Sequence, residues 1–288
     1  MRTLLFVRSY GDFIVALYAL QSAATGTPTQ LLVSRHLWPL YQALPVKALP
    51  PHCELRFIDL GIRHNILAFF TNKFLLSTAC IKELRQLHSL LKELPAKDPV
   101  YFERYPRLFG LQLLMGKRLT PLQEKGVNMY DSYTRFFAAQ PVAEIKWPEC
   151  KASPRLLVIP DSRKKNKTLP DALVQQLQQL DTGSVTTAFF KKMPGRVQSG
   201  QVIVYHDFEH LVQLIGEADM VISPDSLAAH LAQLLSKPHW IFYNKRVNTE
   251  WLTPFSKAHH CYGMFSNFAG LQALLNHTYE SIPDRIAT

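Results

Sequence analysis

Short apolar runs alternate with amphipathic stretches twice along the chain, and a segment without periodicity separates the two series. In the first series, strands are expected at residues 3–7, 30–34 and 55–60, with a helix from residue 13 to 20. In the second series, strands are expected at 155–160, 185–190, 201–205, 220–223 and 239–243, and helices at 171–180, 209–217 and 226–235. Such alternation is typical of parallel sheets covered by helices. The sequence therefore predicts an α/β protein with two Rossmann-like, parallel-sheet domains.

The aperiodic segment at residues 143–154 combines prolines with charged residues, which is typical of a linker between domains. The chain of 288 residues, 47% of them hydrophobic, is long enough to bury two cores. We place the N-terminal domain at residues 1–148 and the C-terminal domain at 149–288. A final helix around Phe268–Leu275 is expected to pack back on the N-terminal domain.

A helical, amphipathic pattern covers residues 66–94, with leucines on one face and lysine and arginine on the other. Such a pattern is typical of a helix pair that covers a sheet. A helix that lies on a membrane surface has the same pattern, and the sequence leaves this alternative open.

The formal net charge of +10 is concentrated in the first half, where residues 1–150 carry 18 Lys and Arg against 11 Asp and Glu. A basic balance favours anionic partners such as phosphorylated sugars, nucleotides, nucleic acid or an acidic membrane face, although an inert basic surface has the same composition. The basic residues are scattered and not interleaved with aromatic residues, which argues against nucleic acid.

Charges at Arg8 and Asp12 interrupt the N-terminal apolar run before a signal sequence or membrane span is complete. The four cysteines lie far apart, without zinc-finger spacing or a disulfide framework. We therefore expect a protein of the cytoplasm, with no metal site.

Two segments of the second half combine a strand end with anion-binding side chains. In the first, an apolar strand ends at Asp225-Ser226 and a helix containing His230 follows. The carboxyl end of a parallel strand beside a helix N-terminus is where such folds bind phosphates, although Asp225 and Ser226 also fit a plain helix N-cap. In the second segment, Ser162 and Lys167 lie in a basic loop between a strand and a helix, which is also typical of a solvated surface loop.

The opening of the chain holds a third segment, in which Ser9-Tyr10-Gly11-Asp12 joins a strand to a helix. A carboxylate next to a glycine turn can accept a proton from a substrate hydroxyl, and it can also cap a helix. All three segments, in this order, resemble the motifs of glycosyltransferase family 9, the heptosyltransferase family. The resemblance spans the chain, with Leu169 where the family has tryptophan and Leu227 where it has glycine. The resemblance implies a GT-B architecture, with two Rossmann-like domains facing a cleft: residues 1–148 on the acceptor side and residues 149–288 binding the nucleotide-sugar.

By this resemblance, Asp12 is the general base, and the nucleotide-sugar donor is bound by Ser9, Ser162, Lys167, His206, Glu209, Asp225, Ser226 and His230. Lys167, Ser162 and Ser226 are expected to stabilise the leaving diphosphate, while His206 and Glu209 are expected to contact the ribose and base. Weaker candidates at the same strand ends are Lys191, Lys192 and Asn244. For all of these residues, a role as ordinary surface residues is the alternative.

The implied activity is inverting, metal-independent transfer of a sugar from a nucleotide-sugar, with an ADP-sugar as one candidate, to a cell-surface glycan or lipid-linked acceptor. No cofactor is implied, and the donor is a substrate. Peripheral contact with the cytoplasmic face of the inner membrane is expected through Lys73, Lys82, Arg85, Arg104, Arg107, Lys117 and Arg118. The alternatives are a nucleotide-sugar epimerase and a catalytically inactive homologue that binds nucleotide or glycan as an assembly partner.

Overall fold

The computed structural model describes residues 1–6, 9–23, 26–45, 49–59, 78–95, 98–102, 119–140, 144–147, 154–181, 183–191 and 201–279. The chain divides into two compact units, Met1–Val142 and Ala143–Thr288. Within the predicted linker, Ile145 and Trp147 pack against the core of the second unit. The division predicted from the sequence, between residues 148 and 149, lies six residues further along the chain than the division between Val142 and Ala143.

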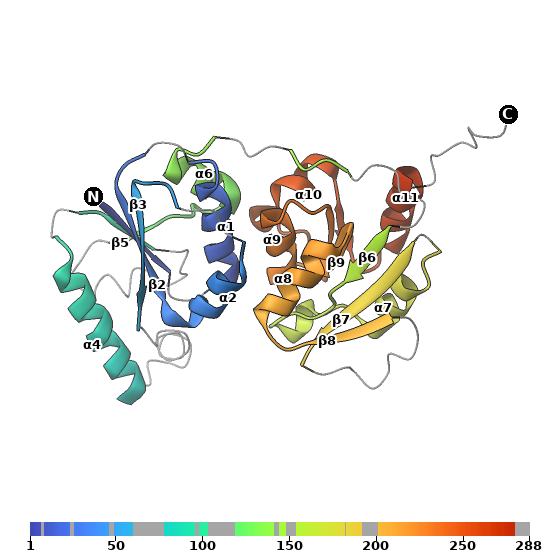
Figure 1. Ribbon diagram of the computed structural model, residues 1–288, viewed down its shortest axis with the longest axis horizontal. Coiled ribbons are helices and arrows are strands. Elements are labelled where there is room, and N and C mark those ends of the chain that lie inside the picture. The colour runs from blue at the N-terminus through green and yellow to red at the C-terminus, as the bar shows by residue number, and fades with distance from the viewer. Residues whose placement is uncertain are drawn as a thin grey trace. The chain divides into compact units, whose positions relative to one another are not determined.

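The first unit is a parallel sheet with helices on both faces, in the order β3-β2-β1-β4-β5 (Figure 1). Its strands are β1 (Arg2–Phe6), β2 (Thr29–Ser34), β3 (Cys53–Ile58), β4 (Val100–Phe102) and β5 (Leu119–Pro121). Its helices are α1 (Tyr10–Leu20), the short 3-10 helix η1 (Arg35–Leu37), α2 (Trp38–Ala43), α4 (Thr78–Glu93) and α6 (Met129–Phe137). Figure 1 shows α1, α2 and α6 on one side of the sheet and α4 on the other.

Strand β1 occupies the middle of this sheet because its side chains are apolar on both faces. Leu4, Leu5 and Phe6 are almost completely buried, which is typical of a parallel strand covered by helices on both sides. Helix α1 follows directly and is buried from Asp12 to Leu20. The sequence therefore places the first residues of α1 at the carboxyl end of the central strand.

The second unit is a six-stranded parallel sheet in the order β11-β10-β9-β6-β7-β8. Its strands are β6 (Arg155–Val158), β7 (Ser184–Phe190), β8 (Gln201–Tyr205), β9 (Met220–Pro224), β10 (His239–Tyr243) and β11 (Tyr262–Met264). Its helices are α7 (Asp171–Gln178), α8 (Phe208–Glu217), α9 (Leu227–Leu234), α10 (Pro254–His259), α11 (Phe268–Tyr279) and the 3-10 helices η2 (Lys165–Lys167) and η3 (Thr249–Trp251).

The two faces of the second sheet carry different apolar clusters. Trp240 and Phe242 of β10 point to the face covered by α7 and α11, where Leu271 and Leu275 of α11 complete the main core. Ile241 and Tyr243 of the same strand pack with Ala229 of α9 on the opposite face. Helix α11 is thus part of the second unit's core, and its predicted packing on the first unit stays a prediction.

The predicted α/β fold with two Rossmann-like parallel sheets is confirmed, and every predicted strand is present. The structure adds the short strands β4, β5 and β11, which have only three residues each. Three residues are too few to show a periodic pattern in the sequence. Of the helical pattern at residues 66–94, the described part is α4, and residues 66–77 lie outside the described residues.

Candidate functional site

The second sheet reverses its strand order between β6 and β9. From β6 the chain continues through α7 to β7 on one side, and from β9 it continues through α9 to β10 on the other. In open parallel sheets the loops at the carboxyl ends of two such strands diverge and leave a crevice that binds ligands. The two motifs predicted for the second half follow these two strands, so the topology brings them to one place.

The loop after β6 is held in a defined conformation by its own hydrogen bonds. Leu169 N donates to Pro160 O at 3.0 Å, which closes the loop at its base. Inside the loop, Ser162 N lies 3.4 Å from Thr168 Oγ1, and Lys164 N lies 3.4 Å from Ser162 Oγ. The Leu169 side chain is buried in the core, which anchors the loop next to Lys167.

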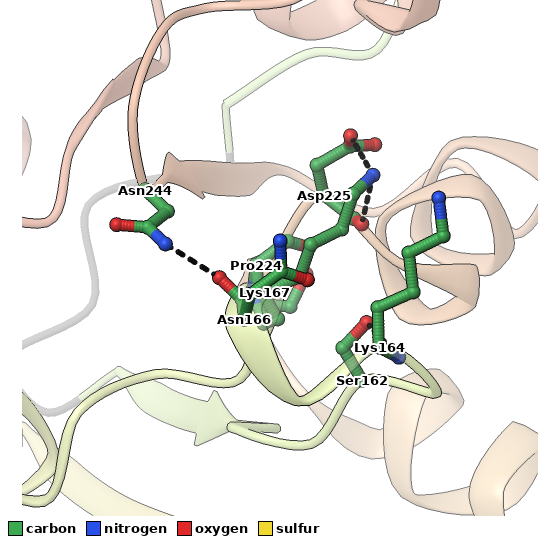
Figure 2. A network of polar contacts seen from close by, with 8 residues as sticks. Ser162, Lys164, Asn166, Lys167, Pro224, Asp225 and Asn244 are labelled. Carbon is green, nitrogen blue, oxygen red and sulfur yellow. Dashed lines mark hydrogen bonds and ion pairs between the residues drawn. The ribbon is translucent and has the colours of Figure 1, made fainter.

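Lys167 forms an ion pair with Asp225, the residue that follows β9. The ammonium Nζ contacts the Asp225 carboxylate oxygen Oδ2 and lies 3.3 Å from the Asp225 backbone O. Figure 2 shows the lysine reaching across from η2 to both groups. The carboxylate side chain is 10% exposed and the lysine side chain 35%, so the ammonium remains accessible to an anion from solvent.

Asn244 joins the same network from the end of β10. Its Nδ2 donates to Asn166 O at 2.7 Å, as Figure 2 shows. The weaker candidate Asn244 therefore fixes the 3-10 turn that carries Lys167. Loops after β6, β9 and β10 are tied together by this network.

Ser226 occupies the N-cap position of α9, but its side chain makes no capping hydrogen bond. Its Oγ is buried without a hydrogen-bond partner among the described residues. The N-terminus of a helix carries a partial positive charge and free N–H groups, which favour an anion. Leu227, which stands where the resembling family has glycine, is the first residue of α9 and is half-buried.

His230 lies one turn further along α9 and is buried, at 4% exposure. Burial lowers the pKa of its imidazole to about 4, with a smaller opposing effect from Asp225 and a lowering effect from Lys167. The ring is therefore neutral near pH 7. It packs edge-on against Trp251, with ring centroids 5.9 Å apart. Within electrostatic reach of Lys167 and Asp225, His230 belongs to the same group of residues.

In the first unit, Ser9 and Asp12 lie at the carboxyl end of β1, next to the point where strand order reverses between β1 and β4. Ser9 takes the extended N-cap position of α1, without a side-chain capping bond, and Asp12 is in the first turn with 5% exposure. The sequence leaves two roles for Asp12, a proton acceptor or a helix N-cap. Because Ser9 takes the N-cap position, Asp12 is not the N-cap of α1.

His206 and Glu209 are exposed at the start of α8, beyond the carboxyl end of β8. The helix is capped by Asp207, whose Oδ1 accepts from His210 N at 2.8 Å. Among the described residues, no contact joins His206 or Glu209 to the Lys167–Asp225 pair. The structure therefore brings together Ser162, Lys167, Asp225, Ser226 and His230, and among the described residues shows no contact between this group and His206 or Glu209.

Two residues that meet at the end of β7 were not predicted as site residues: Asp161, from the loop after β6, and Phe190. Asp161 Oδ2 accepts from Phe190 N at 2.6 Å, and burial raises the pKa of this carboxyl, with a smaller lowering effect from that hydrogen bond. Phe190 is 45% exposed, unusual for a large apolar side chain. A phenylalanine that ends an apolar strand resembles a core residue in the sequence, so only its position in the sheet reveals it.

Lys191 follows Phe190 in the left-handed region, with φ of 64°. Its backbone N donates to Tyr205 O at 2.8 Å, and its Nζ lies 5.0 Å from the centre of the Phe190 ring. Left-handed backbone at a residue other than glycine is strained and is often found at functional sites. Lys192, the other weak candidate, lies outside the described residues.

Among the described residues, no group of three or more His, Cys, Asp and Glu side chains is arranged to hold a metal ion. No helix in the described part of the chain has the length and apolar character needed to cross a membrane. Of the seven residues of the predicted basic face, only Lys82 and Arg85 are described, and both are exposed on α4.

No protein-family profile matches the sequence, and no curated protein matches it. Solved structures do match over nearly the whole chain. The Escherichia coli heptosyltransferase WaaC with ADP is 13% identical, with 96% of this chain and 100% of that chain covered and a TM-score of 0.57. The chain has the fold of the heptosyltransferases.

Two further structures agree with this result. The E. coli ADP-heptose lipopolysaccharide heptosyltransferase II is 14% identical, with coverage of 96% and 98% and a TM-score of 0.56. A glycosyltransferase of family 9 from Veillonella parvula is 13% identical, with coverage of 91% and 84% and a TM-score of 0.56. The GT-B type of fold predicted from the sequence motifs is thereby confirmed.

Proposed function

We propose that the protein is a glycosyltransferase that uses a nucleotide-sugar donor, bound at the carboxyl edge of the second sheet. The observation that carries this proposal is the position of Lys167, a partly exposed ammonium at the point of strand-order reversal, beside the free N-terminus of α9. A diphosphate is the group that such a combination of cation, helix N-terminus and hydroxyl residues binds well. The fold shared with heptosyltransferases supports the same assignment.

In this proposal, the donor diphosphate binds the Lys167 ammonium and replaces its ion pair with Asp225. The ammonium then faces the phosphates, and Ser162, Ser226 and the first N–H groups of α9 donate to them. These groups stabilise the negative charge that develops on the leaving diphosphate, which is the contribution that a metal ion makes in other transferases. The reaction would therefore proceed without a metal ion. His230 stays neutral behind the pair and adds no charge.

Phe190 offers a flat, partly exposed ring at the end of β7, the neighbour of β6. We assign it to the nucleotide base, because an aromatic face stacks on any base. His206 and Glu209 remain proposals for the ribose, on the grounds of the family resemblance alone. ADP-sugars are the first donors to test, because the WaaC structure holds ADP and heptosyltransferase II is named for ADP-heptose.

The acceptor end of the reaction rests on Asp12. A carboxylate at this point can take the proton from an acceptor hydroxyl as its oxygen attacks the anomeric carbon, while the carbon–oxygen bond to the diphosphate breaks. Attack from the side opposite the leaving group inverts the configuration. We propose a cell-surface glycan or its lipid-linked precursor as acceptor, met by a cytoplasmic enzyme at the face of the inner membrane. Ser9, at the N-cap position of α1, remains a proposal for donor binding on the grounds of the family resemblance alone.

The direct test uses the unmodified protein with a panel of ligands. A ligand that binds only the folded state raises the melting temperature, and at equal concentration the tighter ligand raises it more, so ADP, UDP, GDP and inorganic pyrophosphate are compared first. Release of ADP from ADP-heptose, with and without a lipopolysaccharide core acceptor, is measured next. We expect stabilisation by ADP and turnover of the donor. Binding of ADP without transfer or hydrolysis of any nucleotide-sugar would instead identify an inactive binding homologue.

A further inference from the structure

Two buried hydroxyl groups next to Asp225 have no hydrogen-bond partner among the described residues. They are Tyr243 Oη and Ser226 Oγ. The tyrosine is only 4% exposed, so water does not replace the missing partner from bulk solvent. Native proteins contain few such groups, because an unpaired buried hydroxyl is destabilising. Both hydroxyls are therefore available as hydrogen-bond donors when a ligand changes the surroundings of Asp225.

The register of the sheet places Tyr243 beside Asp225. Phe242 of β10 is paired with Pro224 of β9, and Asp225 N donates to Phe242 O at 3.1 Å. Tyr243 and Asp225 are the next residues on these two neighbouring strands, and therefore lie side by side at the sheet edge. Successive residues of a strand point to opposite faces, so the two side chains share a face, the one covered by α9.

Packing and charge agree with this placement. The Tyr243 ring packs with Ala229 of α9 and Leu252, so the ring is fixed beneath the first turns of the helix. Burial raises the pKa of the Tyr243 hydroxyl, and the negative charge of Asp225 raises it further. The Tyr243 hydroxyl therefore keeps its proton and can donate a hydrogen bond to the carboxylate of Asp225.

In the structure, Oδ2 of the carboxylate is paired with Lys167. An anionic ligand that binds Lys167 removes this partner and leaves Asp225, at 10% side-chain exposure, with a poorly compensated charge. We propose that Tyr243 then donates its hydroxyl hydrogen to Asp225, so that the ion pair is exchanged for a hydrogen bond when the ligand binds, while Ser226 donates to the ligand. This inference rests on the proposed function, because it assumes that the anion is the donor diphosphate.

The exchange makes Tyr243 a positioning residue that acts on the ligand through Asp225. Replacing Tyr243 by phenylalanine keeps the ring in its cluster and removes only the donor. We expect ADP to bind Tyr243→Phe roughly 2- to 12-fold more weakly than the unmodified protein, the range typical of one hydrogen bond. The melting temperature without ligand should stay the same or rise, because an unpaired buried hydroxyl has been removed.

A matched control is Tyr262→Phe, since Tyr262 packs partly buried against the same cluster. This variant should bind ADP like the unmodified protein. Affinities are measured by isothermal titration calorimetry with ADP, and melting temperatures by circular dichroism. Equal ADP affinity in Tyr243→Phe and the unmodified protein would overturn the inference. So would a fall in the melting temperature of ligand-free Tyr243→Phe with unchanged affinity, because that result describes a packing role.

A double-mutant cycle with Asp225→Ala, which removes the acceptor, tests whether Tyr243 acts through the carboxylate. In the Asp225→Ala background, the further change Tyr243→Phe should alter ADP affinity by less than twofold. A full loss in both backgrounds would show that the hydroxyl contacts the ligand itself, and would overturn the exchange. The proposed function is judged separately, on the unmodified protein: if it binds neither ADP nor pyrophosphate, the diphosphate site is wrong, and the exchange is wrong with it.

Discussion

The carboxyl edges of the two sheets share the order of their first five strands and differ in chemistry. In the second unit, the strands at the reversal point are followed by the Lys167–Asp225 ion pair, Ser226 and the N-terminus of α9, which together offer an ammonium and hydrogen-bond donors. In the first unit, the central strand is followed by Ser9 and the buried carboxylate of Asp12. By the function proposed above, the same sheet architecture presents an anion-binding edge in one unit and a proton-accepting edge in the other. The few residues after each strand decide which.

The largest effect is expected at the proton-accepting edge. Replacing Asp12 by Asn removes the proton acceptor with little change in shape, so turnover should fall by roughly 10²- to 10⁴-fold. Affinity for ADP, measured by calorimetry, should not change, because the anion-binding edge is intact.

Asp131 supplies a matched control, since it is also an aspartate in the first turn of a helix of the first unit. Asp131→Asn measures what the loss of a first-turn carboxylate does to stability. If Asp12→Asn and Asp131→Asn have the same turnover, Asp12 is only a helix-terminal residue, and the contrast between the edges disappears.

A smaller effect is expected at the anion-binding edge. Lys167→Ala removes a charged donor that acts in both the ground and the transition state, so ADP affinity and turnover should fall together, by roughly 10- to 100-fold. Lys165→Ala is the control, because Lys165 is an exposed lysine of the same 3-10 turn. Equal losses in both variants, measured by calorimetry and ADP release, would mean that only the general charge of the loop matters.

The pH dependence of stability should also differ between the two units. His239 is buried, with Nδ1 2.8 Å from Lys237 O and Nε2 2.6 Å from Thr253 Oγ1, and burial lowers its pKa to about 4, as it does for His230. A histidine with a lowered pKa in the folded state takes up protons on unfolding. Its contribution to stability is complete above pH 6.5, is lost as pH falls toward 4, and changes little below that.

We therefore expect the melting temperature of the second unit to fall by several degrees between pH 6.5 and 4.5. Circular dichroism of the whole protein over this range, compared with His239→Gln, measures the effect. The variant should be less stable at pH 7.5 and should show a shallower decline with acid. An unchanged decline would assign the pH dependence to other groups.

The smallest effect is expected at the N-terminus of α8. His206 and Glu209 are exposed and, among the described residues, lie apart from the Lys167 network, so His206→Ala and Glu209→Ala should each weaken ADP binding by no more than about threefold. A loss as large as that of Lys167→Ala would extend the anion-binding edge to α8. Calorimetry with ADP and with pyrophosphate separates a contact to the nucleoside from one to the phosphates.

The sequence predicts the fold well because long apolar strands and amphipathic helices carry periodic patterns, as in β9 and α8. It also predicts that Lys167 and Asp225 meet, since both follow strands that a doubly wound sheet brings together. Their direct ion pair, however, depends on the path of the loop, which Asn244 fixes from a third strand. The sequence does not predict site roles for Tyr243 and Phe190, because an aromatic residue in an apolar strand has the same pattern as a core residue. Only register and exposure distinguish them.

The position of β1 and β6 in their sheets has a consequence for how the protein is made. Each is the first strand of its unit, and each lies between two others, β1 beside β2 and β4, and β6 beside β7 and β9. During synthesis, β2 is made soon after β1 and can pair with it, whereas β4 is made much later. In the second unit, β6 lacks its neighbour β9 until β7, β8 and α8 have been made. A nascent chain thus carries one unpaired apolar strand edge during most of the synthesis of each unit, the interval in which chaperones are most useful to such a protein.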